Sequence, residues 1–110
     1  MPAAIYSPEG DCMGYEKLST ITTATTFTST EYIYKGKIAQ AALITVETAA
    51  IRFTMDGTTP LVTGATEAGH KIDAGQSFVV RGYKSISQFK CINETAGNGA
   101  KVFVSFYFLP

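Results

Sequence analysis

The stretch Val102-Phe103-Val104-Ser105-Phe106-Tyr107-Phe108-Leu109 decides the fold class of this chain. Its side chains alternate with a period of two residues, which is the period of a β-strand. One face would carry Val102, Val104, Phe106 and Phe108, and the other would carry Phe103, Tyr107 and Leu109 around Ser105. Both faces are apolar, so the strand needs cover on both sides. It is either a central strand inside the domain, or a strand whose outer face meets another subunit.

The same alternation continues upstream, in short segments separated by turn residues. Residues 42–47 and 51–56 predict two strands joined as a hairpin, and residues 76–81 and 86–93 predict two more. An Asn-Gly pair at 98–99 predicts a second hairpin, which joins residues 86–93 to the final strand. Six to eight short strands at this spacing predict an all-β, antiparallel β-sandwich or jelly-roll-like domain.

The first thirty residues differ from the rest of the chain. Residues 19–30 are a Thr-rich, β-branched run that resists helix formation, so we expect an extended segment. Residues 1–18 are rich in turn formers and predict an irregular arm or lid. We therefore divide the chain into an N-terminal arm, residues 1–30, and a β-sandwich domain, residues 31–110.

The predicted arm carries more apolar surface than a solvated tail usually keeps. It would pack either on a neighbouring subunit or on its own domain. Together with the outer face of the last strand, it supplies the candidate partner-binding residues, which are Ile5, Tyr6, Met13, Tyr15, Leu18, Ile21, Phe27, Phe103, Tyr107 and Leu109.

Charge and hydropathy exclude two classes of partner. The 110 residues hold nine Lys and Arg against nine Asp and Glu, which leaves no cationic excess for a phosphate backbone. No segment approaches the roughly 20 apolar residues that span a bilayer. We therefore expect one compact domain that binds neither nucleic acid nor a membrane.

Residues for catalysis or metal binding are scarce in this sequence. His70 is the only histidine and stands in a polar stretch between Gly69 and Lys71, which indicates a loop on the surface. Cys12 and Cys91 have no metal-ligand spacing, and we expect both to be reduced thiols. Phosphate-binding glycine loops and a nucleophile elbow are also missing. The sequence predicts no catalytic residues, no metal, no cofactor and no enzymatic activity.

The segment Ile51-Arg52-Phe53-Thr54-Met55-Asp56-Gly57-Thr58-Thr59-Pro60 resembles a strand-and-turn motif in chitobiase-type β-sandwich domains. That resemblance implies an alternative function, a carbohydrate-binding β-sandwich module. The chain has no tryptophan, so Tyr15, Tyr32, Tyr34 and Tyr83 would have to cluster to form the sugar platform. The same Asp-Gly-Thr-Thr-Pro residues also suit any strand that ends in a tight turn.

Over residues 40–108 the sequence pattern is similar to small virion proteins of tailed bacteriophages and prophages. The pattern comprises the segment from Ala42 to Pro60, the stretch from Gly69 to Tyr83, a strand from Ile86 to Ile92 and the apolar last strand. Such proteins are typically non-enzymatic. Capsid decoration or cement proteins suit this chain best, since they are small, β-rich, often trimeric, and commonly clamp capsomers with a terminal arm.

The resemblance implies a virion structural protein, assembled in the cytoplasm of a bacterial host. Its partner would be the major capsid protein or another virion subunit, and it would form a homo-oligomer, with a trimer favoured. The predicted arm, residues 1–30, would supply the clamp. A Thr-rich strand that adds to an exposed sheet edge, with Ile21 and Phe27 seated in pockets, would contribute main-chain hydrogen bonds.

Overall fold

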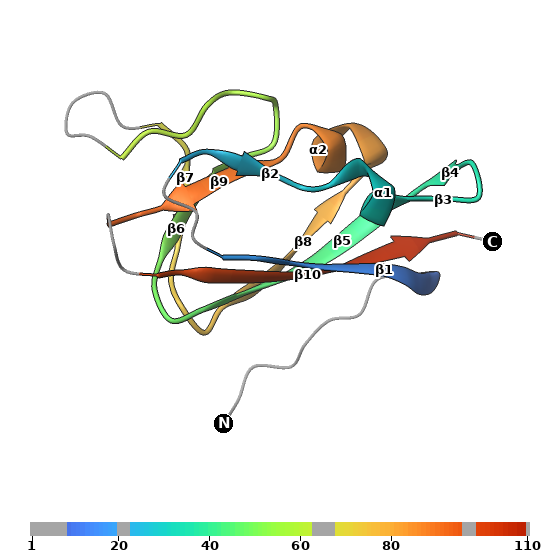
Figure 1. Cartoon of the computed structure of the whole chain (residues 1–110), viewed down its shortest axis with the longest axis horizontal. Coiled ribbons are helices and arrows are strands. Elements are labelled where there is room, and N and C mark those ends of the chain that lie inside the picture. The colour runs from blue at the N-terminus through green and yellow to red at the C-terminus, as the bar shows by residue number, and fades with distance from the viewer. Residues whose placement is uncertain (1–8, 20–22, 63–67, 96–98, 110) are drawn as a thin grey trace.

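The computed structural model describes residues 9–19, 23–62, 68–95 and 99–109. Two four-stranded antiparallel sheets face each other (Figure 1). Sheet A contains, in spatial order, β1 (Asp11–Leu18), β10 (Lys101–Phe108), β5 (Ala41–Glu47) and β8 (Ser77–Arg81). Sheet B contains β2 (Thr25–Thr26), β9 (Lys90–Asn93), β6 (Ile51–Thr54) and β7 (His70–Ile72). The predicted all-β, antiparallel sandwich is confirmed.

The strand order is that of a jelly roll. Strands pair from the two ends of the chain inward, as β1 with β10, β2 with β9, β5 with β8, and β6 with β7. This long folded ribbon then rolls up, so that β10 also pairs with β5 and β9 also pairs with β6. Successive pairs of the ribbon therefore alternate between the two sheets, which produces the double-sheet arrangement of this fold.

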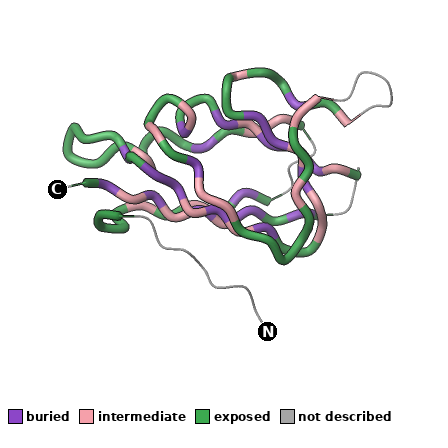
Figure 2. Tube along the Cα trace, turned by 180° about the vertical axis from the view of Figure 1, so that it is seen from behind, coloured by how far each residue is buried: buried purple, intermediate pink, exposed green. Residues whose placement is uncertain are grey.

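The core lies between the sheets and combines aliphatic side chains with a cluster of aromatic rings. Phe53 of sheet B stacks on Phe78 of sheet A with ring centroids 4.6 Å apart. Phe27, just after β2, meets Phe106 of sheet A edge-on at 5.2 Å. Buried positions alternate with more exposed ones along the strands of both layers (Figure 2). The inward residues of the last strand, predicted from its alternation, all belong to this core.

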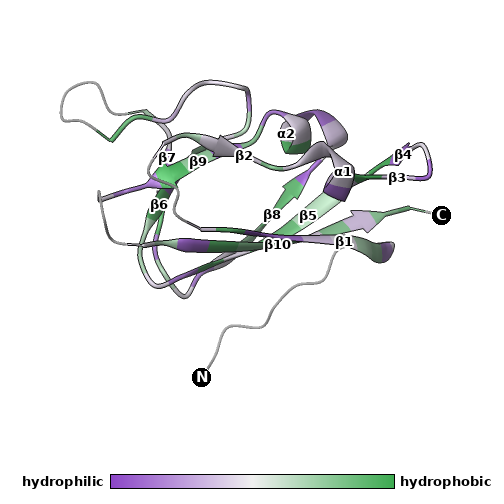
Figure 3. Cartoon of the chain, viewed as in Figure 1, coloured by the Kyte–Doolittle hydropathy of each residue, from purple (hydrophilic) through white to green (hydrophobic). Residues whose placement is uncertain are grey.

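Short elements close one end of the sandwich. They are α1 (Ser29–Tyr32), the hairpin of β3 (Ile33–Tyr34) with β4 (Lys37–Ile38), and α2 (Tyr83–Ser87) (Figure 1). Hydrophobic residues lie mainly within the strands, while the tip of the β3–β4 hairpin is hydrophilic (Figure 3). Fully buried Ile86 anchors α2 to the core.

Both predicted hairpins are wrong. β5 and β6 lie in opposite sheets, and so do β9 and β10. The connection after β5 turns at Thr48, whose positive φ of 77° redirects the chain toward sheet B. Alternation shows which side chains share a face, but it does not show which strand is the neighbour, because a jelly roll pairs segments that are distant in sequence.

Two further segments differ from their predicted structure. The strand predicted over residues 86–93 is the end of α2 followed by β9, because Ile86 and Phe89 are both buried and their three-residue spacing suits a helical turn. The surface loop predicted around His70 is instead the strand β7, which pairs with β6. His70 begins that strand, with its ring 5.6 Å from the Phe53 ring.

The boundary predicted at residue 30 is also wrong. β1 pairs with β10 along its length, and β2 pairs with β9, so the sandwich begins within the predicted arm. A bulge between Cys12 and Gly14 keeps the alternation of β1 from appearing in the sequence. Gly14 lies directly against the Glu31 carbonyl, where a Cβ would have no room. Ile5, Tyr6 and Ile21 lie outside the described residues.

Candidate interaction surface

The side of sheet A that faces away from sheet B is the candidate functional surface. We call it the outer face of sheet A. In cross-strand rows it consists of Lys17, Phe103, Thr45 and Ser77; Tyr15, Ser105, Leu43 and Val79; and Cys12, Tyr107, Ala41 and Arg81. Residues that are partners across antiparallel strands point to the same face, so each row is a line of neighbouring side chains.

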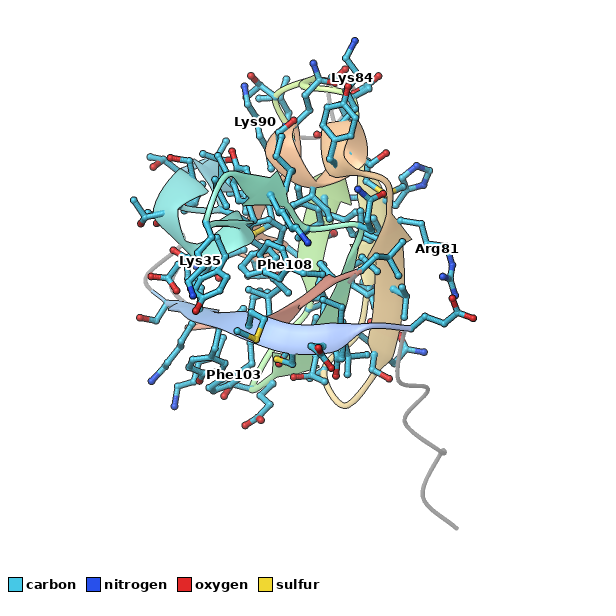
Figure 4. The ribbon with its side chains drawn as sticks, turned by 90° about the vertical axis from the view of Figure 1, so that its right-hand side faces the viewer. Lys35, Arg81, Lys84, Lys90, Phe103 and Phe108 are labelled. Carbon is cyan, nitrogen blue, oxygen red and sulfur yellow. The ribbon has the colours of Figure 1, made fainter. Side chains whose placement is uncertain are left out.

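Alternation on β10 places its apolar side chains on both sides of sheet A. Phe108 points up between the layers and Phe103 points down, away from them (Figure 4). Phe103, Tyr107, Leu43 and Val79 are only half-buried. Among the described residues, no helix or strand lies below this face in Figure 1. The central strand of the sheet therefore presents aromatic and aliphatic groups to the outside.

Tyr15 and Lys17 complete the aromatic part of this surface on the edge strand β1. The Tyr15 side chain is exposed at 55 % of its surface, beside Ser105 of β10. Lys17 Nζ lies 5.7 Å from the centre of the Phe103 ring, within the range of a cation–π contact. Such contacts contribute little at exposed sites, so the ring of Phe103 stays available to a partner.

Charged side chains lie at the two ends of the outer face. At one end, Glu47 of β5 is the cross-strand partner of Lys101 of β10. At the other end, a hollow of about 300 Å³ is lined by Glu9, Gln40, Ala41, Arg81 and Leu109. An apolar middle with charged ends is the composition of a protein contact surface.

The structure brings together only some of the predicted partner-binding residues. Tyr15, Phe103 and Tyr107 share the outer face of sheet A. Met13 and Leu109 lie at its end, where they line a second hollow of about 180 Å³ beside Tyr34 and Phe108. Leu109 lines both hollows and so connects the outer face to the β3–β4 hairpin.

Leu18 and Phe27 are core residues and not contact residues, so their predicted role is wrong. Leu18 is 6 % exposed and Phe27 is 3 % exposed. The Phe27 ring stacks on Phe89 at 4.5 Å. The Glu16 carboxylate accepts hydrogen bonds from the Thr28 backbone N–H at 2.8 Å and from its hydroxyl at 2.6 Å, which holds the end of the Thr-rich segment on β1.

Leu43 and Val79 belong to the outer face but were not among the predicted contact residues. The alternation of residues 42–47 does separate Leu43 from the core side chains Ala42 and Ile44. The sequence does not show that β5 pairs with β10 and β8. That pairing puts Leu43 and Val79 in one cross-strand row with Tyr15 and Ser105.

A polar pocket lies on the opposite side of the fold, near sheet B. Thr54, Met55, Asp56, Thr58, Gly69 and His70 line about 430 Å³ of open space there. The Thr58 backbone N–H donates to Asp56 Oδ1 at 3.0 Å, and hydrogen bonds from Thr58 hold the pKa of Asp56 below its ordinary value. The Asp56 carboxylate thus stabilises the turn that follows β6.

The tyrosines proposed as a sugar platform lie in three places. Tyr15 is on the outer face of sheet A, and Tyr83 begins α2. The rings of Tyr32 and Tyr34 contact Phe106 and Phe108 at centroid distances of 5.9 and 6.2 Å, at the end closed by α1 and the β3–β4 hairpin.

We expect a thiol reagent such as Ellman's to modify one cysteine per native chain and two per unfolded chain. Cys12 is exposed, whereas Cys91 is buried and burial raises its pKa to about 12. At a pH of about 8, about one Cys91 thiol in ten thousand is then ionised, and only the thiolate reacts. A Cys12→Ser control should leave no fast-reacting thiol, and rapid labelling of that variant would contradict the burial of Cys91.

In the described part of the chain, His, Cys, Asp and Glu nowhere gather in a group of three that would hold a metal ion. No described helix has the length and hydropathy of a membrane span. Comparison with protein-family models, curated proteins and solved structures found no match to this chain.

Proposed function

We propose that the chain is a non-enzymatic structural protein of a tailed-phage virion, which binds the capsid lattice as a decoration or cement subunit. The observation that carries this proposal is the outer face of sheet A, where a central strand exposes Phe103 and Tyr107 beside Leu43 and Val79. Contiguous apolar surface of this kind marks protein contacts in soluble proteins. The jelly roll is also a common architecture of capsid domains, which supports the proposal by analogy.

The proposed mechanism is multivalent. Each subunit makes a weak contact with the major capsid protein, and a small oligomer repeats that contact, so later contacts form within one complex and gain avidity. Because β1 (Asp11–Leu18) belongs to the sandwich, this part of the predicted arm is not a free clamp.

The test begins with particles of the phage or prophage that encodes the chain, purified on a density gradient. We expect mass spectrometry to find the chain in the particle band in many copies per capsid. Purified chain added to particles that lack it should co-sediment with them. A chain absent from the particles would contradict the proposal.

Deleting residues 2–8 tests the predicted clamp and leaves β1 and every other described strand in place. We expect the co-sedimenting fraction to fall about tenfold or more, because one of several linked contacts is lost. Tyr83→Lys, a change of an exposed residue in α2, is the matched control and should co-sediment as the unaltered chain does. Unchanged binding of the deletion variant would remove the clamp from the mechanism.

The alternative, a carbohydrate-binding module, has less support from the geometry. The described residues that line the polar pocket beside Asp56 and His70 include no pair of stacked aromatic rings, which sugar sites usually present. A glycan array probed with the purified chain distinguishes the two functions. A signal that disappears in a His70→Ala variant would favour the carbohydrate module.

A further inference from the structure

We propose that the hollow beside Phe108 binds one phenylalanine side chain of an acidic, extended segment of a partner protein. The hollow lies between β1, the end of β10 and the β3–β4 hairpin, and its apolar walls are Met13, Tyr34, Phe108 and Leu109. We call it the Phe108 hollow. The inference deepens the proposed function by naming the chemistry of the segment that the partner inserts, and it rests on that function only for the source of the segment.

The size of the Phe108 hollow suits a single aromatic ring. Apolar cavities of about 150 Å³ hold benzene, whereas sites for whole small molecules usually span about 300–1,000 Å³. A hollow of about 180 Å³ therefore accepts one phenyl group and not a larger ligand. Because the hollow opens to the surface, the group that it accepts can belong to a chain that continues outside it.

The walls of the hollow have the chemistry that an aromatic ring contacts favourably. Phe108 is 5 % exposed, and the Tyr34 ring meets it edge-on with centroids 6.2 Å apart. Methionine sulfur also contacts aromatic rings favourably, and its flexible side chain adapts to the ring that it meets. Met13, Tyr34 and Leu109 are three of the nine large hydrophobic residues that the described part of the chain exposes. A ring in the hollow would therefore remove apolar surface of both partners from water.

The bulge in β1 supplies Met13 to the hollow. Cys12 pairs with Tyr107 and Gly14 pairs with the preceding residue, Phe106, so Met13 is the extra residue of the bulge. Bulges change the direction of a side chain and occur preferentially beside functional sites. The irregularity that hides β1 in the sequence thus serves to line this hollow.

The rim of the hollow selects an acidic segment. Two ammonium groups, those of Lys35 and Lys37, lie at the rim with one carboxylate, that of Asp11, which leaves an excess of one positive charge. Neither lysine forms an ion pair with another described residue. A carboxylate next to the inserted ring would therefore find an unpaired cation on the hairpin side of the hollow, and charge complementarity of this kind gives an interface its specificity.

The β3–β4 hairpin holds both lysines at the rim. Tyr34 and Lys37 are cross-strand partners, so they share the face of the hairpin that lines the hollow. Lys35 and Gly36 have φ angles of 51° and 77°, as the central residues of a type I′ turn require. Asn, Asp and Gly are preferred at the position of Lys35, and a residue kept in an unfavourable conformation points to a function of its side chain. Lys35 Nζ lies 5.4 Å from the centre of the Tyr34 ring, which places the charge beside the wall.

The first test is a titration of the isotopically labelled full chain with the peptide Ser-Glu-Phe-Glu-Ser, followed by NMR. The peptide is acetylated and amidated so that its ends are uncharged, and a glutamate on each side of the ring allows for both directions of the segment. We expect the amide signals of Lys35, Lys37 and Leu109 to shift. Ser-Glu-Ala-Glu-Ser lacks the ring and Ser-Lys-Phe-Lys-Ser reverses the charges, and each should bind about tenfold more weakly or worse.

The second test reverses the charge of the rim. Changing both Lys35→Glu and Lys37→Glu should weaken binding of the glutamate peptide about tenfold or more, and should make the lysine peptide the better ligand. A merely structural role of the lysines would not reverse this preference. Lys84→Glu with Lys90→Glu changes the net charge equally at sites that lie apart from Lys35 and Phe108 in Figure 4, and should leave the preference unchanged.

Circular dichroism checks that these variants fold. If the double variant does not, Lys37→Glu alone leaves the turn residue in place and should still weaken binding of the glutamate peptide about threefold.

Three outcomes would overturn the inference. They are the absence of shifts at about 5 mM glutamate peptide, equal binding of the peptides with and without the ring, and equal binding of the glutamate and lysine peptides. These results are independent of the capsid experiment. A chain that binds the peptide but is absent from purified particles would remove the proposed function and leave this site in place. A chain that is present in the particles but does not bind the peptide would do the reverse.

Discussion

We expect Phe89→Ala to lower the free energy of unfolding by about 3–5 kcal/mol, which is a large part of the roughly 5–15 kcal/mol that holds a domain folded. Phe89 is fully buried between the sheets. Its ring stacks on Phe27 at 4.5 Å and on Phe53 at 5.7 Å, and lies 6.4 Å from Phe78. Those three rings come from both sheets, so the cavity would loosen the contact between the two layers.

Urea unfolding followed by circular dichroism measures this loss. Phe103→Ala is the matched control, because it removes the same side chain from the half-buried outer face and leaves no enclosed cavity. We expect its cost to be below about 1.5 kcal/mol. If Phe89→Ala does not fold, Phe89→Leu should still unfold at lower urea than Phe103→Leu. Equal costs at the two positions would contradict the assignment of Phe89 to the core.

The fold class was predictable because the period-two alternation of apolar side chains shows which residues lie on the same face of a strand. Val102, Val104, Phe106 and Phe108 are buried as their period-two pattern predicts, and the strand at 76–81 was predicted within one residue. Partner strands were not predictable. The jelly roll joins β1 to β10 across nearly the whole sequence, and no local signal specifies such distant pairing.

The candidate surface was predictable in part for the same reason. Phe103 and Tyr107 were identified because they lie on one strand whose two faces are both apolar. Leu43 and Val79 lie on the same face only because of the cross-strand register of β5 with β10 and β8. That register exists once the sheet has formed. Leu18 and Phe27 were assigned to an arm because the bulge in β1 and the two-residue β2 hide the strand pattern on which sequence prediction depends.

The start of β1 depends on Gly10, and we expect Gly10→Ala to lower the free energy of unfolding by about 2–5 kcal/mol. Gly10 has a φ of +97°, a left-handed conformation that costs an L-residue about 1–2 kcal/mol. A Cβ there would also overlap the Phe108 carbonyl of β10. Because that neighbour is backbone, the strands must shift, and overpacking of this kind costs about 1–3 kcal/mol more.

Gly75→Ala separates the cost of the left-handed conformation from the cost of the Cβ overlap with the backbone. Gly75 has a similar φ of +87°, and a Cβ there would meet nothing within 4 Å. It should therefore show the conformational cost alone, about 1–2 kcal/mol in the same urea titration. Gly10→Ala should also speed hydrogen exchange at the amides of β1, whereas Gly75→Ala should not. Equal unfolding costs for both variants would show that the start of β1 is not held against β10.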